Sequence, residues 1–151
     1  MIYNFAQFVE WPGTNLKPSQ SPFVIGIFGE DPIEAILNDT LKGETFQNRA
    51  VQVRQGSALS DAKVCDILFV PQSQQKHISE VLEAIRGDST LTVGDTEDFI
   101  LLGGMIAFKK EGNKVRFQIN PEAATRSGLK ISSKLLRLAV PQSDSSTKGG
   151  N

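Results

Sequence analysis

The sequence predicts an α/β domain of three layers: a mixed, mainly parallel sheet with a C-terminal antiparallel hairpin, and helices on both faces. Three observations predict it. Two short runs are almost wholly apolar, Phe23–Phe28 and Asp66–Val70, which is typical of strands buried on both faces of a parallel sheet. Segments with helical apolar periodicity alternate with these runs. A hairpin signal at Glu111-Gly112-Asn113 then adds an antiparallel section.

Length and composition predict a single folded domain. The chain has 151 residues, of which 39% are hydrophobic and 22% charged, with nine Phe. A chain of this length buries about 70% of its unfolded surface, so a folded core is expected and whole-chain disorder is excluded. No apolar stretch approaches the roughly 20 residues that span a bilayer, and no signal peptide follows Met1. We predict one domain over residues 1–140 and a disordered polar tail over residues 141–151.

The first segment predicts a helix, a loop and a buried strand. Met1–Glu10 has apolar residues at helical spacing and ends before Pro12, which disfavours helix at the residue ahead of it. Asn15–Pro22 contains two prolines and is predicted to be a loop. The apolar strand Phe23–Phe28 follows.

The next elements are a helix, a strand and a short connection. The helix begins at Asp31-Pro32, with Asp as N-cap and Pro at the first helical position, and Gly43 closes it. Its apolar face consists of Ile33, Ile36, Leu37 and Leu41. Ala50–Arg54 alternates apolar and polar residues, which indicates a strand with one more solvent-exposed face. Ser57–Lys63 is predicted to be a turn or short helix.

The middle of the chain predicts strand, helix, strand and turn. The strand Asp66–Val70 stops at Pro71. Ser73–Arg86 has the clearest helical pattern. Its apolar stripe consists of Ile78, Val81, Leu82 and Ile85. Leu91–Val93 is predicted to be a short strand, and Asp95–Leu102 a capped helical turn.

The last part predicts a hairpin and two helices. Met105–Lys109 and Lys114–Ile119 are its two strands. Asn120-Pro121 caps a helix through Arg126, and Ser132-Ser133 caps a final helix, Lys134–Val140.

Charge is divided unevenly along the chain. The formal net charge is −1, but residues 1–104 hold 7 basic and 14 acidic side chains, whereas residues 105–140 hold 8 basic and 2 acidic ones. A basic segment suits an acidic partner, nucleic acid or lipid headgroups. These basic residues alternate with apolar ones rather than forming a run. That pattern favours a solvent-exposed acidic face and a solvent-exposed basic face whose charges pair within the fold. Because Phe108 and Phe117 are then expected to face inward, nucleic-acid binding is not predicted. Direct membrane insertion is not predicted either, since no apolar stretch is long enough.

The sequence offers no complete catalytic set. His77 is the single His, lies among polar neighbours, and has no second His or Cys at metal-ligand spacing, so no metal site and no cofactor are predicted. Cys65 is the single Cys and is expected to be a buried, unpaired thiol, although composition alone permits a hydrolase that uses Cys65 with His77.

Acidic residues gather where two parallel strands are expected to end. They are Glu30 and Asp31, and Asp95, Glu97 and Asp98. Open α/β folds bind ligands at such strand ends, and the arrangement resembles the acidic pocket of a phosphoacceptor receiver domain. The strand before Pro71 has no terminal carboxylate, however, and helix capping explains these acids equally well. The glycine turn at Gly26–Gly29 lacks a phosphate-loop Lys, and Glu30 and Asp31 would repel phosphate.

Trp11 has two interpretations. It packs the first helix against the sheet, or it forms an aromatic ligand pocket with Phe5 and Phe8.

Several segments, in order and spacing, resemble the YfiR-like family of small bacterial periplasmic proteins. They are Tyr3–Pro12, Phe23–Gly29, Cys65–Val70, Gly103–Ile106, Val115–Asn120, Ala123-Ala124 and Gly128–Leu136. The resemblance covers about residues 2–140, and the closing stretch is the most specific part.

The resemblance implies a non-enzymatic regulator. The best-known member binds and inhibits the periplasmic sensor region of a membrane-bound diguanylate cyclase, which lowers cyclic-di-GMP and biofilm formation, and the resemblance implies the same for this chain. Similar domains also occur attached to membrane sensor kinases. The resemblance further implies export with a removed signal peptide, and a homodimer. The best-known member is linked to redox state through disulfides, but Cys65 has no partner Cys in this sequence.

Two binding roles remain open: partner inhibition, and a small-molecule sensor coupled to a membrane sensor kinase. The predicted ligand or partner residues are Trp11, Asp95, Glu97, Arg116 and Asn120, with Cys65 as an unpaired redox thiol.

Overall fold

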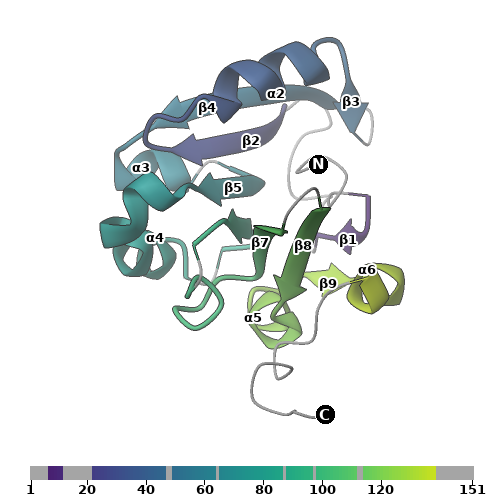
Figure 1. Ribbon diagram of the computed structural model, residues 1–151. Helices are drawn as coiled ribbons and strands as arrows, with labels where there is room; N and C mark the ends of the chain where they lie inside the picture. The colour runs from purple at the N-terminus through teal and green to yellow at the C-terminus, as the bar shows by residue number, and fades with distance from the viewer. Residues whose placement is uncertain are drawn as a thin grey trace.

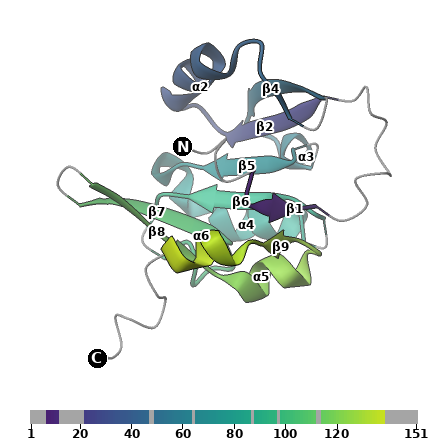
Figure 2. The same ribbon diagram turned by 90° about the vertical axis from the view of Figure 1, so that its right-hand side faces the viewer.

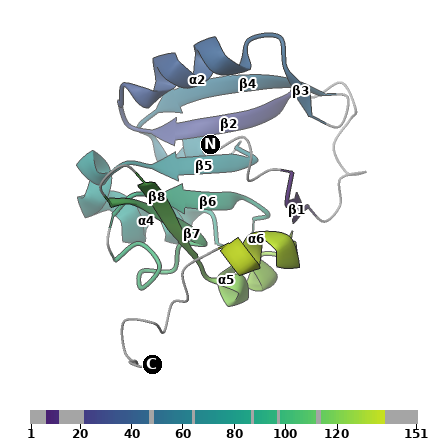
Figure 3. The same ribbon diagram turned by 45° about the vertical axis from the view of Figure 1, so that its right-hand side comes forward.

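A seven-stranded sheet forms the centre of the molecule, in the order β3-β4-β2-β5-β6-β7-β8 (Figure 1). The computed structural model describes residues 7–11, 22–46, 49–63, 65–86, 88–96, 98–111 and 114–138. The five inner strands are parallel: β4 (Arg49–Gly56), β2 (Phe23–Phe28), β5 (Ile67–Val70), β6 (Leu91–Gly94) and β7 (Ile106–Glu111). Figure 3 shows β2, β5 and β6 running in the same direction.

Antiparallel pairs close the sheet at both ends. β3 (Thr45–Phe46) pairs with the start of β4, and β8 (Lys114–Ile119) forms a hairpin with β7 along six residue pairs. The hairpin extends beyond the neighbouring strands (Figure 2). A separate two-stranded sheet joins β1 (Val9–Glu10) to β9 (Lys130–Ile131).

Helices cover both faces of the sheet, which makes three layers. On one face, α2 (Ile33–Leu41), α5 (Pro121–Arg126) and α6 (Ser133–Leu138) pack over a core that includes Ile25 and Phe69. On the other face, α3 (Leu59–Ala62) and α4 (Ile78–Ala84) pack over a second core that includes Val24 and Leu68. Neighbouring residues of β2 and β5 thus enter opposite cores, because side chains alternate along a strand. The predicted fold class is confirmed.

Polar side chains start three of the helices. The Asp31 Oδ1 accepts a hydrogen bond from the Ile33 backbone N–H at 2.9 Å, and α2 begins at Ile33, just after the predicted Pro32. Asn120 Oδ1 accepts from Ala123 N at 3.2 Å to cap α5. Ser132 Oγ accepts from Lys134 N at 3.1 Å at the start of α6. The caps of α5 and α6 were readable from the sequence because they are local. The cap predicted for α2 is wrong, since Pro32 rather than Asp31 is the N-cap residue and the helix begins one position later than expected.

The predicted helix at Met1–Glu10 is wrong where the structure describes it. Val9 and Glu10 form a strand that pairs with Ile131 and Lys130, and Phe8 O accepts from Ser132 N at 2.7 Å. The pairing partner lies more than a hundred residues away, so local helical spacing did not reveal it. Residues 1–6, most of the predicted loop, and the predicted tail lie outside the described residues.

Three other expectations need correction. Residues 72–77 form a 3-10 helix, η2 (Gln72–His77), ahead of α4, because this polar stretch has no apolar stripe to hold it as one α-helix with Ile78 onward. Ile36 is 61% exposed, so the apolar face of α2 is narrower than predicted and centres on Leu37 and Leu41. Residues 98–103 are hydrogen-bonded turns rather than helix.

Candidate functional site

The sheet has a topological switch point between β2 and β5. After β2, the chain passes through α2 to β4, which lies beside β2 on one side. It then returns to the other side of β2, where β5, β6 and β7 follow in order. Numbered among the parallel strands alone, the order is 2-1-3-4-5, the doubly wound arrangement in which ligands bind at the carboxyl ends of the two strands flanking the switch. The carboxyl ends of β2 and β5 are Phe28 and Val70.

Two carboxylates lie near this switch point. Asp31 follows β2, and Asp95 follows β6. Burial raises the pKa of the Asp95 carboxyl above 3.8, the Gln72 backbone N–H opposes this as a hydrogen-bond donor, and the nearby Asp31 charge raises the pKa further. Asp31 and Asp95 thus lie after the parallel strands β2 and β6, where acids were expected. Glu97 lies outside the described residues.

A glycine turn shapes the same edge. Gly29 has a φ of +87°, and its N–H donates to Gly56 O at 2.8 Å. The Gln74 side chain lies directly against it, since a Cβ on Gly29 would stand 2.5 Å from Gln74 Nε2. Gln55 Oε1 accepts from Asp31 N at 3.4 Å. The segments after β2, β5 and β6 and the last residues of β4 thus converge at the carboxyl ends of the strands.

We expect Asp95→Asn to raise the melting temperature at pH 7. Because the folded state raises the pKa of Asp95, it binds that proton more tightly than the unfolded chain, so the ionised carboxylate opposes folding at neutral pH. As the pH falls through the folded pKa to below 3.8, the wild type becomes protonated in both states and the advantage of the variant disappears. Melting curves from pH 7 to 3 measure this. Asp31→Asn, which keeps the capping oxygen, should shrink the effect; a wild type more stable than Asp95→Asn at pH 7 would contradict it.

The opposite ends of the parallel strands, where β2, β4 and β5 begin, hold a buried ion pair. Arg49 Nη2 lies 3.3 Å from Asp66 Oδ2 and donates to Pro22 O at 2.8 Å, and the two side chains are 10% and 4% exposed. Asp66 Oδ2 also accepts from Val24 N at 2.9 Å. The Arg49 guanidinium lies 5.4 Å from the centre of the Phe23 ring. This pair ties together the starts of β2, β4 and β5.

Trp11 joins this pair rather than the acidic edge. Its Nε1–H donates to Asp66 O at 3.3 Å, and its ring packs edge-on against Phe23 and Phe46 at 5.4 and 5.9 Å. Phe8 packs against the adjoining core. Of the two interpretations of Trp11, packing against the sheet is the one that these contacts support.

The remaining predicted site residues lie apart from Asp95. Asn120 caps α5 and donates through its N–H to Met105 O at 2.7 Å, which places it near the start of β7. Arg116 is exposed on β8, in register with Lys109 of β7. Trp11 and Asn120 therefore lie at the opposite ends of the parallel strands from Asp95, and Arg116 lies two strands away from Asp95 on β8, so the structure does not unite these four residues in one pocket.

Cys65 lines a cavity of about 280 Å³ under α3, together with Arg54 and Asp61. Its thiol is buried and donates to Asp61 O at 3.3 Å. A Cβ on Gly26 would stand 2.1 Å from the sulfur, so the thiol packs on bare backbone of β2. His77 is exposed and its Nδ1 lies 3.1 Å from Glu80 Oε1. An activated cysteine nucleophile is a partly exposed thiol in electropositive surroundings, whereas Cys65 is buried. His77 is paired with Glu80 on the surface rather than with this thiol.

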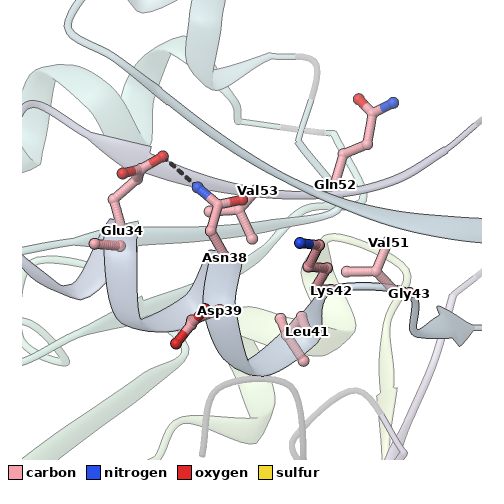
Figure 4. Close-up of a pocket in the computed structure, with 10 residues that line it drawn as sticks. Glu34, Asn38, Asp39, Leu41, Lys42, Gly43, Val51, Gln52 and Val53 are labelled. Carbon is pink, nitrogen blue, oxygen red and sulfur yellow. Dashed lines mark hydrogen bonds between the residues drawn. The ribbon is translucent and has the colours of Figure 1, made fainter.

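A larger groove of about 710 Å³ runs between α2 and β4 (Figure 4). Glu34, Asn38 and Lys42 line its helical wall, one turn apart, and Val51 and Val53 form its floor. Glu34 accepts a hydrogen bond from the Asn38 side chain, whereas Asp39 points away from the strand (Figure 4).

Sequence reasoning missed Arg49, Asp66 and the groove. A signal existed for the first two: Arg49 is the first residue of β4, and Asp66 directly precedes the wholly apolar β5. Within the described ranges, no cluster of three His, Cys, Asp or Glu side chains could hold a metal ion. No helix in the described part of the chain is long and apolar enough to cross a membrane.

Comparison with known proteins adds the relationship that geometry alone does not supply. A family model described as YfiR/HmsC-like matches residues 1–140. A solved structure of a conserved domain protein from Vibrio cholerae O1 biovar El Tor str. N16961 has a TM-score of 0.61 and 12% sequence identity, over 78% of this chain and 54% of that chain. The chain thus spans about half the length of that protein, and the likeness shows the fold alone. A comparison with curated proteins found no match.

Proposed function

The chain belongs to the YfiR/HmsC-like family, and from this premise we propose that it binds and inhibits the periplasmic sensor region of a membrane-bound diguanylate cyclase. The family match over residues 1–140 carries the proposal. Inhibition would lower cyclic-di-GMP and biofilm formation. The protein acts in the periplasm as a regulator without catalysis of its own, in keeping with the buried Cys65 and the exposed His77.

Arg116 is the proposed partner contact with the best placement. It is exposed on β8, and its register neighbour Lys109 is a second exposed cation. Two cations side by side on a projecting hairpin suit an acidic partner surface. Arg is also among the residues that most often dominate binding energy at interfaces. Trp11, Asp95, Glu97 and Asn120 remain proposed contacts of the same partner or of a ligand.

Calorimetry with the purified periplasmic sensor region of a diguanylate cyclase from the same organism tests the proposal. We expect saturable binding, and a fall in cyclic-di-GMP synthesis when the chain is added to the membrane-embedded cyclase. Arg116→Glu should weaken binding at least about tenfold. Arg86→Glu makes the same change at the end of α4, where the side chain is 79% exposed, and should leave affinity unchanged. Absence of binding, or binding without any fall in synthesis, would contradict the proposed inhibition.

A small-molecule sensor coupled to a membrane sensor kinase is the second candidate, favoured by Asp31 and Asp95 at the switch point. Two carboxylates there suit a ligand that carries an amine or another cation. Thermal-shift screening of amino acids, polyamines, nucleotides and sugars tests this, because a ligand of the native state raises stability. A hit that is lost in Asp95→Asn supports the sensor role; a blank across these classes counts against it.

A further inference from the structure

The turn between β6 and β7 holds two exposed leucines. Leu101 is 81% exposed and Leu102 is 40% exposed, and the two are consecutive in the chain. The other large apolar side chains exposed in the described residues, Ile36 and Leu59, lie singly on α2 and α3. Single exposed apolar residues are normal at a protein surface, whereas apolar side chains that adjoin form the kind of patch found at contact sites.

The backbone of this turn is fixed, so the leucines are presented in one arrangement. Gly104 N donates to Phe99 O at 2.9 Å, and Leu102 N donates to Asp98 O at 3.0 Å. The Phe99 ring is fully buried against Gly94 and Gly104, which anchors the turn on the core. A surface that is already ordered loses little conformational entropy on binding, so apolar area buried there contributes fully to affinity.

The turn crosses the face of the sheet that carries the exposed cations of the β7–β8 hairpin. Phe99 packs in the same core as Ala107, on the side of α3 and α4. Phe108 packs against the opposite core, so Lys109 returns to the face of Ala107, about 7 Å further along β7. Arg116 is the register partner of Lys109 on β8 and shares that face.

The start of the turn lies close to these cations. The chain leaves β6 at Gly94, which is in register with Ala107, two positions before Lys109. It then crosses the sheet face to begin β7 at Ile106. Leu101 and Leu102 therefore belong to the same surface as Lys109 and Arg116. An apolar centre with a charged rim is the usual anatomy of a protein-binding surface.

The rim carries both signs of charge, which favours a protein partner over a lipid surface. Asp95 stands at the start of the turn, and Asp98 is exposed within it. Anionic headgroups that reached Leu101 would also meet these two carboxylates. A protein can instead place one carboxylate against the hairpin cations and leave the acidic side of the turn without an anion opposite it.

We propose that Leu101 and Leu102 are the apolar anchor of the contact with the sensor region of the cyclase. This inference rests on the proposed function and adds the chemistry of the partner. The partner presents an apolar side chain that covers the two leucines, and a carboxylate that faces Lys109 and Arg116. Apolar burial supplies affinity, and the charges fix the orientation of the partner.

Calorimetry with the full chain and the purified sensor region tests this. Leu101→Ala should weaken binding at least about tenfold. Its melting temperature should stay within about 2 °C of the wild type, because the side chain is 81% exposed. Leu101→Glu should weaken binding more than Leu101→Lys, since only the Glu side chain repels the carboxylate of the partner. Ile36→Ala truncates a side chain that is 61% exposed on α2 and should leave affinity unchanged.

The possible results separate this inference from the proposed function. Binding of the wild type with unchanged affinity in Leu101→Ala overturns the inference and leaves the proposed function standing, whereas no binding of the wild type overturns both. Sedimentation with phosphatidylglycerol vesicles that Leu101→Ala abolishes would assign the turn to a membrane surface instead. A dimer of the wild type that Leu101→Ala dissociates would assign it to a second copy.

Discussion

Arg49→Met is expected to lower the free energy of unfolding by about 3–5 kcal/mol. The substitution keeps the volume of the side chain roughly constant but leaves the Asp66 carboxylate, 3% exposed as a residue, without its cation. An unpaired buried charge costs far more than an intact buried pair contributes, because the desolvation penalty is no longer offset. Urea unfolding followed by Trp11 fluorescence measures the loss of stability. Trp11 reports on this region because its indole N–H donates a hydrogen bond to the backbone oxygen of Asp66.

Two further variants isolate the pair itself. Arg49→Met combined with Asp66→Asn should lose less stability than the two single changes together, with a coupling energy of about 0.5–3 kcal/mol. Arg86→Met repeats the substitution at an exposed pair, in which Arg86 and Glu83 are 79% and 70% exposed, and should change stability by no more than about 0.5 kcal/mol. Equal losses at Arg49 and Arg86 would mean that the buried network contributes nothing specific.

Phe99→Ala is expected to cost about 3–5 kcal/mol. The Phe99 ring is fully buried and is the anchor of the turn that follows β6. Gly94 and Gly104 hold it closely: a Cβ on either would stand 2.6 or 2.2 Å from ring atoms. Removing the ring leaves a cavity between two glycines whose backbone cannot fill it. Thermal and urea unfolding measure the loss.

Leu101→Ala is the matched control in the same turn. Leu101 is 81% exposed, so its truncation should change stability by no more than about 0.5 kcal/mol. Because Phe99 lies four residues after Asp95, the Phe99→Ala variant should also reduce the pH-dependent effect predicted for Asp95→Asn. A loss below about 1 kcal/mol at Phe99 would show that the turn is held by its backbone hydrogen bonds instead.

The candidate sites were only partly predictable. The acids at the ends of β2 and β6 were visible, because a strand end and an acidic residue are both local features, and the parallel arrangement then implies a shared edge. Arg49 with Asp66 was not paired in advance, since Asp66 comes seventeen positions after Arg49, beyond the rest of β4 and α3. The groove beside β4 was also missed, because it depends on how short β3 is and on where α2 crosses the edge.

By itself, the sequence determined the parallel core, the hairpin and the caps of α5 and α6. Apolar runs such as Phe23–Phe28, a glycine loop and an Asn-Pro cap each depend on only a few neighbouring residues, so they can be predicted from the sequence. Tertiary structure alone decided that Val9 and Glu10 are a strand, that Ile36 faces solvent, and that the outer edge of β4 stays open. The reason is physical: each outcome depends on what another segment, distant in sequence, does or does not place beside the residue.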